Sequence, residues 1–373
     1  MGFIRVKKGE VAVGQELPWS VYRESGTLLL HKGHVIEHQH QLDMLIDMGF
    51  HQEAKADRLA FLLKKVIDDP FVYAEELHQQ LLPLLKHLTL PTADGGQRLQ
   101  YVVKLLIRLC TEFSDAMIAQ VHRSDVVPYS ITHSLHTAIL SATLAKQYGM
   151  EGIDLERVVS AALTANLGML DLQDSLERHN GKLSEEQRQK IHEHPLESKN
   201  ILQANVTDDE LWLTMVEQHH ENMDGSGYPH QLHGEDIVVG ARIIAIADRY
   251  SAMVSKHIYH KQMNASEVLR IFYQDKGLTL DEELCLQFIH CLGVFPPGCF
   301  VELVNGEKAI VTAHSHNKSQ HWPLVSSYKG MDGHYYISPL KRDTNYSEYK
   351  IKGMAESEKV PFSNSSIWGF TTL

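Results

Sequence analysis

The stretch HHENMDGSGYP at residues 219–229 decides which fold this sequence predicts. His219 and His220 end an amphipathic helical pattern, and the NMDGSGYP that follows Glu221 holds two glycines and a proline. This composition predicts a tight turn beside the two imidazoles. Adjacent residues on a regular helix point about 100° apart, so both imidazoles can serve one site only at a helix end or around two metals. The predicted turn supplies such a helix end.

Three further polar residues lie on or beside helical patterns whose apolar faces would bury them. They are His133 in THSLHTAIL, His194 in IHEHP and Asp248 in RIIAIADRY. A buried aspartate needs a partner that compensates its charge. A His-His pair alone is more often a surface pair than a metal site. A metal site is therefore favoured because these three residues accompany the His-His pair.

In this order and spacing, the segments HSLHTAIL, GKLSEEQRQKIHEHP, HHENMDGSGYP and GARIIAIADRYSAM resemble the HD-GYP family of cyclic di-GMP phosphodiesterases. The resemblance implies hydrolysis of a cyclic dinucleotide at two or three metal ions, usually iron or manganese. Bridged metals make one bound water a hydroxide and also stabilise the leaving oxygen. By resemblance, one metal would be held by His133 and Asp248, and the other by His194, His219 and His220.

The His-Asp pair that names this family is missing. The family pattern falls on LTANLGM at residues 163–169, where Ala165 replaces the histidine, Asn166 the bridging aspartate and Met169 a lysine. A neutral amide bridges two dications poorly, because their mutual repulsion is then uncompensated. We therefore expect a degenerate catalytic site at Asn166 and Asp248, without a full bimetallic centre. One iron, manganese or zinc ion on the three histidines is the expected cofactor.

The resemblance also implies phosphate-binding residues after the aspartate of RIIAIADRY. The family usually has an aspartate three residues later, an arginine nine later and a basic residue twelve later; this sequence has Ser251, His257 and His260. A neutral histidine lacks the bidentate fork of arginine, and the neighbouring lysines are candidates to compensate. The ligand-binding candidates are Lys256, His257, His260 and Lys261.

The rest of the sequence predicts a mainly α protein, an HD-type helical bundle with a small N-terminal α/β module and a small C-terminal β appendage. A long amphipathic helix is expected from Arg98 through Met117. Asn305-Gly306 between alternating apolar residues predicts a hairpin. The expected domains are the α/β module at 1–55, connecting helices at 56–124, the HD-GYP-like domain at 125–292, and the β appendage and tail at 293–373.

Composition excludes several classes of protein. The formal net charge of −12 opposes binding to a nucleic acid polymer, which requires clustered basic residues. The sequence has no signal-peptide pattern and no run of about 18 apolar residues that would span a membrane. The four cysteines lack the spacing of a zinc site or a disulfide scaffold. These features predict a cytoplasmic protein without a membrane partner.

Three functions remain open from the sequence. The first is a degenerate HD-GYP protein that binds cyclic di-GMP, or binds a signalling partner through an exposed loop at Gly227, Tyr228 and Pro229. The second is an active phosphodiesterase whose centre is rebuilt by Asn166 or by a displaced carboxylate such as Asp171 or Asp174. The third is a ligand-free scaffold for a diguanylate cyclase or another regulator. The retained histidines and aspartate could also simply satisfy one another by hydrogen bonds in a core.

Overall fold

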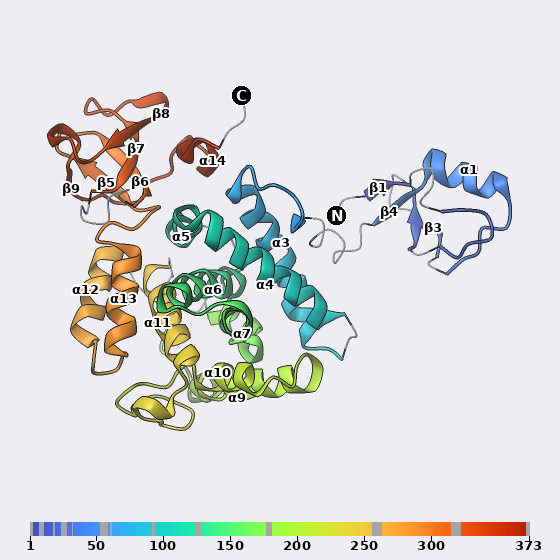
Figure 1. Ribbon diagram of the computed structural model, residues 1–373, viewed down its shortest axis with the longest axis horizontal. Coiled ribbons are helices and arrows are strands. Elements are labelled where there is room, and N and C mark those ends of the chain that lie inside the picture. The colour runs from blue at the N-terminus through green and yellow to red at the C-terminus, as the bar shows by residue number, and fades with distance from the viewer. Residues whose placement is uncertain are drawn as a thin grey trace. The chain divides into compact units, whose positions relative to one another are not determined.

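The structure is a computed structural model that separates into two compact units, residues 1–65 and 66–373. Figure 1 labels most of their elements. The described residues are 3–6, 11–17, 19–23, 28–31, 33–52, 59, 62–91, 94–123, 128–176, 181–255, 263–314 and 322–370.

The first unit holds a small sheet and helix α1. Its strands pair in antiparallel fashion in the order β1-β4-β2-β3. Val21, Ile36 and Leu45 lie in its apolar core. The predicted N-terminal α/β module is therefore confirmed. Its elements are β1 (Phe3–Arg5), β2 (Val21–Tyr22), β3 (Leu28–Leu30), α1 (Gln39–Met48) and β4 (Phe50–Gln52).

The second unit is mostly helical, which confirms the predicted mainly α fold. None of its described helices combines the length and apolar composition that a membrane crossing requires, nor does α1. Its helices before the C-terminal sheet are α3 (Pro70–Leu88), α4 (Gly95–Glu112), α5 (Ser114–Arg123), α6 (Tyr129–Tyr148), α7 (Gly152–Thr164), η1 (Leu167–Met169), α8 (Leu170–Leu176), α9 (Glu185–Asn205), α10 (Glu210–Gln218), η2 (Gly234–Asp236), α11 (Val239–Val254), α12 (Ala265–Asp275) and α13 (Glu282–Leu292).

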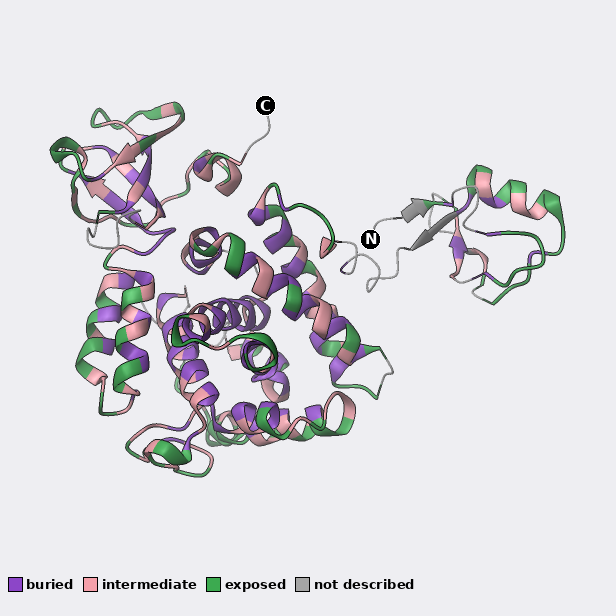
Figure 2. Ribbon diagram, viewed as in Figure 1, coloured by how far each residue is buried: buried purple, intermediate pink, exposed green. Residues whose placement is uncertain are grey.

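Helix α6 is the central helix of this unit. It is buried along most of its length, as Figure 2 shows, and packs most extensively against α7 and α11. Its sequence is less apolar than that of an ordinary core helix, because His133, His136 and several hydroxyl side chains are buried with it. Buried polar groups need partners. The buried polar side chains of α6 are therefore candidates for a functional site.

The predicted single helix from Arg98 through Met117 is wrong, because the chain breaks at Phe113. Helix α4 ends at Glu112, and Phe113 adopts φ −137° and ψ 46° while its N–H still donates to the carbonyl of Leu109. The apolar residues continue on the same side after the break, and Met117 in α5 is buried like Leu109 in α4. Periodicity alone therefore gives no sign of the break.

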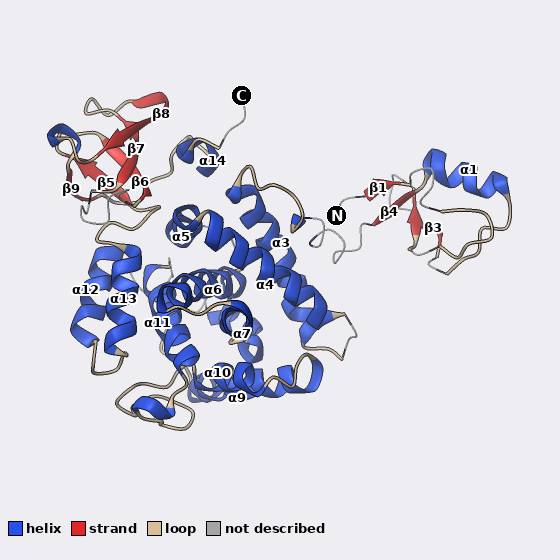
Figure 3. Cartoon of the chain, in the orientation of Figure 1, coloured by secondary structure: helices blue, strands red, loops and turns tan. Residues whose placement is uncertain are grey.

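The C-terminal β appendage is a five-stranded antiparallel sheet in the order β8-β7-β6-β5-β9, shown in red in Figure 3. The predicted hairpin is confirmed, since Phe300 of β5 pairs with Ile310 of β6 and Gly306 in the turn has φ 84°. The elements are β5 (Phe300–Leu303), β6 (Lys308–Ala313), β7 (Leu324–Lys329), β8 (Tyr335–Asp343), η3 (Ser347–Tyr349), β9 (Ile351–Met354) and α14 (Asn364–Trp368).

Helix α14 attaches this sheet to the helices. The ring of Trp368 lies edge-on to that of Phe71 in α3, with 5.0 Å between centroids. Nε of Arg123 in α5 donates to Oδ1 of Asn364 at 2.7 Å. The end of the chain and the first helices of the unit therefore pack together.

Candidate metal centre

Helices α6 and α11 place His133 against Asp248. Nε2 of His133 lies 2.7 Å from Oδ1 of Asp248, and both side chains are buried. Nδ1 of His133 lies 3.2 Å from the hydroxyl of Ser251 and 3.3 Å from that of Tyr129. A hydroxyl can donate to Nδ1 while Nε2–H donates to the carboxylate. This pair is therefore satisfied without a cation.

Asp248 is ionised in this environment. Burial alone would raise the pKa of its carboxyl, but the adjacent His133, through its electrostatic attraction and its hydrogen bond, holds that pKa well below its ordinary value. Burial lowers the pKa of His219 and His220 by more than the charge of Asp248 raises it. The site thus combines one buried carboxylate with neutral imidazoles.

Helix α9 and the end of α10 bring the Nε2 atoms of His194 and His219 close together. Nδ1 of His194 lies 2.6 Å from the carbonyl oxygen of Ile191, and Nδ1 of His219 lies 2.7 Å from that of Val216. A carbonyl oxygen only accepts hydrogen bonds, so each Nδ1 carries a proton. The two Nε2 atoms are 3.3 Å apart. They therefore point lone pairs at each other with no proton between them.

A cation would stabilise these facing lone pairs. Burial, together with the neighbouring His219, lowers the pKa of His194 to about 3, so its ring is neutral and free to act as a ligand. His220 completes the group, because ligand atoms of the three histidines lie within 4.8 Å of one another. Two nitrogens bound to one tetrahedral ion at about 2.0–2.1 Å lie roughly 3.3 Å apart. The spacing of the Nε2 atoms fits one metal ion.

The turn between α7 and η1 carries the residues that replace the missing pair. Ala165 is fully buried, Asn166 is 1% exposed, and neither Oδ1 nor Nδ2 of Asn166 has a hydrogen-bond partner in the described part of the chain. The N–H of Gly168 donates to Oγ of Ser198, and a Cβ on Gly168 would lie 3.0 Å from the carbonyl oxygen of His194. The turn therefore packs directly on α9 beside the metal-binding candidates, with a neutral amide in place of a carboxylate.

The carboxylates that follow this turn have other partners. The side chain of Asp171 is 90% exposed and pairs with Nζ of Lys86 at 3.2 Å. Oδ1 of Asp174 accepts a hydrogen bond from the backbone N–H of Ser130 at 2.9 Å, at the start of α6. Neither carboxylate rebuilds the centre in this structure, and Met169 is half-buried in η1.

The loop at Gly227, Tyr228 and Pro229 folds back over the end of α10. A Cβ on Gly227 would lie 2.6 Å from the carbonyl oxygen of His220, so this close approach requires glycine. The ring of Tyr228 stacks on that of His220 with 4.8 Å between centroids. Gly227 is buried and Tyr228 and Pro229 are half-buried. The predicted exposure of this loop is wrong for Gly227 and only partly met by Tyr228 and Pro229, because the tyrosine packs on the imidazole.

A buried carboxylate holds the chain that follows this loop. Oε1 of Glu221 accepts from the backbone N–H of His230 at 2.6 Å, and Oε2 accepts from that of Leu232 at 3.0 Å. Nη2 of Arg249 in α11 donates to Oδ1 of Asn222 at 2.8 Å. Glu221 and Arg249 thus hold the two sides of the loop. The hydrogen bonds of Glu221 go to the backbone after the loop, so this carboxylate orients the turn and not one of the clustered imidazoles.

The predicted phosphate-binding residues lie outside the described residues. Their assignment as ligand contacts stays a prediction. They are Lys256, His257, His260 and Lys261.

Sequence reasoning missed the two hydroxyls that contact His133. Tyr129 precedes His133 by four residues on α6, and Ser251 follows Asp248 by three on α11. Residues three or four apart on a helix are neighbours. This spacing is the signal that could have identified both.

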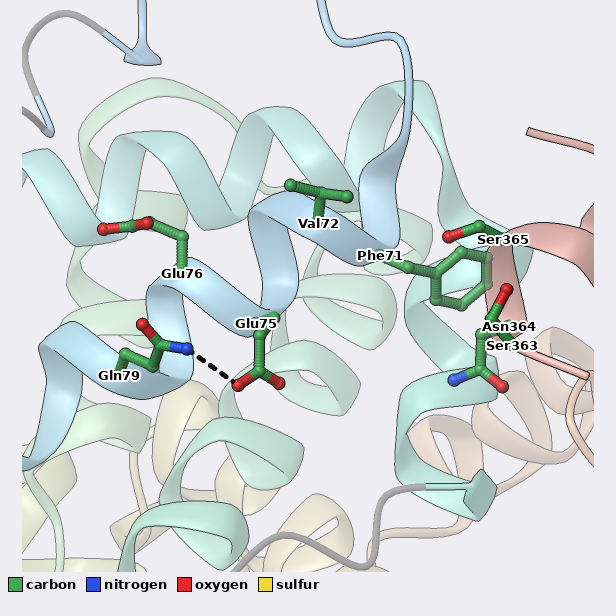
Figure 4. A pocket seen from close by; sticks show the side chains of 8 residues that line it. All are labelled: Phe71, Val72, Glu75, Glu76, Gln79, Ser363, Asn364 and Ser365. Atoms are coloured by element: carbon green, nitrogen blue, oxygen red, sulfur yellow. Dashed lines mark hydrogen bonds between the residues drawn. The ribbon is translucent and has the colours of Figure 1, made fainter. Parts of the chain in front are cut away.

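An open pocket elsewhere in the unit lies between α3 and the start of α14 (Figure 4). Glu75 accepts a hydrogen bond from Gln79 there at 3.0 Å, and Glu76 lies beside them. Two carboxylates make this pocket unsuitable for the phosphates of a dinucleotide. Its lining residues are Phe71, Val72, Glu75, Glu76, Gln79, Ser363, Asn364 and Ser365.

Residues 113–284 match the family model described as an HD domain. The chain is 29% identical to the cyclic di-GMP phosphodiesterase PdeB of Borreliella burgdorferi over 175 residues, 47% of this chain and 46% of that protein. It is 27% identical to a cyclic di-GMP phosphodiesterase of Pseudomonas aeruginosa over 214 residues, 57% of this chain and 51% of that protein. The chain therefore spans about half the length of these relatives.

The chain is also similar to a relative named for another cyclic dinucleotide and to a solved structure. The chain is 32% identical to 3'3'-cGAMP-specific phosphodiesterase 1 of Vibrio cholerae over 143 residues, 38% of this chain and 33% of that protein. The solved structure of Bd1817, an HDG"Y"P protein from Bdellovibrio bacteriovorus, has the same fold. Its TM-score is 0.51 at 14% identity, covering 77% of this chain and 98% of that one.

The matched residues include α6, α9, α10 and α11, so the candidate metal centre lies within the region that matches the HD domain. The curated relatives that match this region are cyclic dinucleotide phosphodiesterases, and this chain has Ala165 and Asn166 where the HD-GYP pattern has its His-Asp pair.

Proposed function

We propose that this protein binds cyclic di-GMP or a related cyclic dinucleotide as a signalling ligand and does not hydrolyse it. The observation that carries the proposal is the buried amide of Asn166, which lies without a hydrogen-bond partner among the described residues where the family places a bridging carboxylate. A neutral amide does not offset the repulsion between two dications. The two-metal mechanism of phosphodiester hydrolysis then lacks its second metal.

The retained residues support binding of one metal ion. His194, His219 and His220 would hold it, and iron, manganese and zinc are all compatible with imidazole ligands. When bound, the ion supplies positive charge for a phosphate oxygen of the ligand. His133 and Asp248 bond to each other in this arrangement and stabilise the junction of α6 and α11.

The chemical class of the ligand comes from the relatives. Their names give cyclic di-GMP and 3'3'-cGAMP as substrates, and both are cyclic dinucleotides. The overall charge of −12 disfavours a nucleic acid polymer, so a small anion at a local cation is the better match. The four cysteines are free, as in proteins of a reducing compartment, and we place the protein in the cytoplasm.

Calorimetry with purified full chain, combined with chromatography of the same sample, tests this proposal. We expect saturable binding of cyclic di-GMP or 3'3'-cGAMP with the cyclic nucleotide recovered intact. Linear dinucleotide produced in a metal-dependent manner would refute it. The metal content of the same sample is measured as well, so that an absence of hydrolysis can be told apart from a mere loss of the metal ion.

An active phosphodiesterase is the second candidate function. The retention of His133, the three clustered histidines and Asp248 favours it. It requires Asn166 to serve as a bridge through its unpartnered Oδ1. The chromatographic result above decides between this candidate and the binding protein.

A scaffold for a diguanylate cyclase or another regulator is the third. Asp224 and Ser226, at the tip of the loop before Tyr228, are exposed and bonded to each other at 2.6 Å, which presents a polar surface to a partner. A scaffold binds the partner without any cyclic dinucleotide. Binding of a cyclic dinucleotide to the chain alone, detected by calorimetry, would therefore argue against a scaffold.

A further inference from the structure

Tyr228 lies between two imidazoles. Its ring centroid is 4.8 Å from that of His220 at an interplanar angle of 27°, and 4.4 Å from that of His192 at 22°. His192 is an exposed residue of α9, Tyr228 is half-buried, and His220 belongs to the metal-binding candidates. The three rings therefore form a continuous column, called here the ring stack, from the surface to the metal cluster.

His220 is held differently from the other two clustered histidines. His194 and His219 are each fixed by a hydrogen bond from Nδ1 to a backbone carbonyl. Within the described ranges, no hydrogen bond is made by a ring nitrogen of His220. Its ring contacts instead the ring of His219 at 4.1 Å and that of Tyr228. Stacking thus takes the place of the hydrogen bond that usually orients a metal-binding histidine.

We propose that His192 is a positioning residue that holds Tyr228 against His220 and so orients the third metal ligand. This inference rests on the metal site of the proposed function. Without His192, the outer face of Tyr228 loses its cover and the ring can tilt away from His220. An aromatic pair contributes about two- to tenfold to an equilibrium constant. His192 itself is not a ligand, since it lies beyond Tyr228 and outside the group of three.

The test is titration of metal-free full chain with Co²⁺ alone, followed by its visible absorption bands. We expect His192→Ala to weaken Co²⁺ binding about three- to tenfold and to change the band pattern, because the geometry at His220 changes. His192→Phe keeps a ring on Tyr228 and should restore both the affinity and the spectrum. His290→Ala, which removes another exposed histidine, is the matched control and should match the wild type.

The thermal unfolding midpoint of metal-free protein should differ by no more than a few degrees among these variants, because His192 is exposed and only one ring contact is lost. Wild-type affinity and spectrum in His192→Ala would overturn the inference, and so would failure of His192→Phe to restore them. A wild-type chain that binds no Co²⁺ would overturn the inference together with the proposed metal site. Cyclic dinucleotide binding, measured separately, still decides the proposed function.

Discussion

Nε2 of His133 and Oδ1 of Asp248 lie 2.7 Å apart at the buried junction of α6 and α11, and form a pair that needs no cation. The Nε2 atoms of His194 and His219 lie 3.3 Å apart with no proton to share, and form a pair that does. The two halves of the site therefore have different requirements. We infer that the first half serves stability and that the second is the metal-binding half of the site.

Replacing Asp248 with asparagine should destabilise the fold. The variant loses the buried negative charge of Asp248, which His133 stabilises. The amide oxygen of asparagine can still accept the hydrogen bond from His133. We expect the free energy of unfolding to fall by about 1–3 kcal/mol in urea titrations. Asp171→Asn is the matched control, because its exposed pair with Lys86 should contribute less than about 1 kcal/mol. Equal effects of the two substitutions would contradict this division of roles.

Metal binding should depend on the histidine cluster and not on His133. We expect His219→Ala to weaken Zn²⁺ or Mn²⁺ binding by more than about tenfold, because it removes one of three ligands. His133→Ala should keep a stoichiometry of one metal per chain while lowering stability. Elemental analysis after dialysis measures both. Two metals per wild-type chain, with one lost in His133→Ala, would show that a bimetallic centre survives.

Gly227→Ala should disturb the loop that carries Tyr228. A Cβ at this position would meet the backbone of Glu221 at 2.5 Å and that of His220 at 2.6 Å. Backbone atoms cannot move aside cheaply, so we expect a loss of about 1–3 kcal/mol in the free energy of unfolding. Gly353→Ala, where a Cβ meets nothing within 4 Å, serves as the control. A Gly227→Ala chain as stable as this control would show that the loop adapts.

Stability should fall in mild acid because of His136. Its Nδ1 is buried without a hydrogen-bond partner in the described part of α6 and its surroundings, and burial lowers its pKa from 6.5 to about 3. The unfolded chain therefore takes up the proton first as the pH falls. The contribution to stability is fully present above pH 6.5 and is lost between pH 6.5 and 3, by about 1 kcal/mol per pH unit.

Urea unfolding of wild type and His136→Leu at several pH values isolates this contribution. The difference between their free energies of unfolding should change with pH below 6.5 and stay constant above it. A difference that does not vary between pH 4.5 and 6.5 would mean that His136 is hydrated in the folded chain.

The sequence predicted the fold and the identity of the clustered histidines, because the segments around His133, His194 and Asp248 carry a specific motif in a fixed order. It also predicted the hairpin at Gly306, where a turn has a strong local signal. The break at Phe113 was not predictable, because apolar periodicity continues through it. Long-range packing decides where such a helix divides.

The interior of the site was less predictable than its ligands. That Nε2 of His194 faces Nε2 of His219 depends on which backbone carbonyl each Nδ1 meets, and no sequence pattern encodes this. The stacking of Tyr228 on His220 likewise depends on how the loop returns over α10. The missing carboxylate, in contrast, was readable from LTANLGM alone, and the structure added that Asn166 is buried without a partner among the described residues.

Hydrolysis of cyclic di-GMP by wild type and by the triple variant Ala165→His, Asn166→Asp, Met169→Lys, at measured metal content, tests the central claim most directly. We predict that the wild type leaves the dinucleotide intact and that the variant, with its bridging carboxylate restored, gains a second metal and linearises it. Metal-dependent turnover by the wild type would contradict the claim that this protein binds its ligand without catalysis.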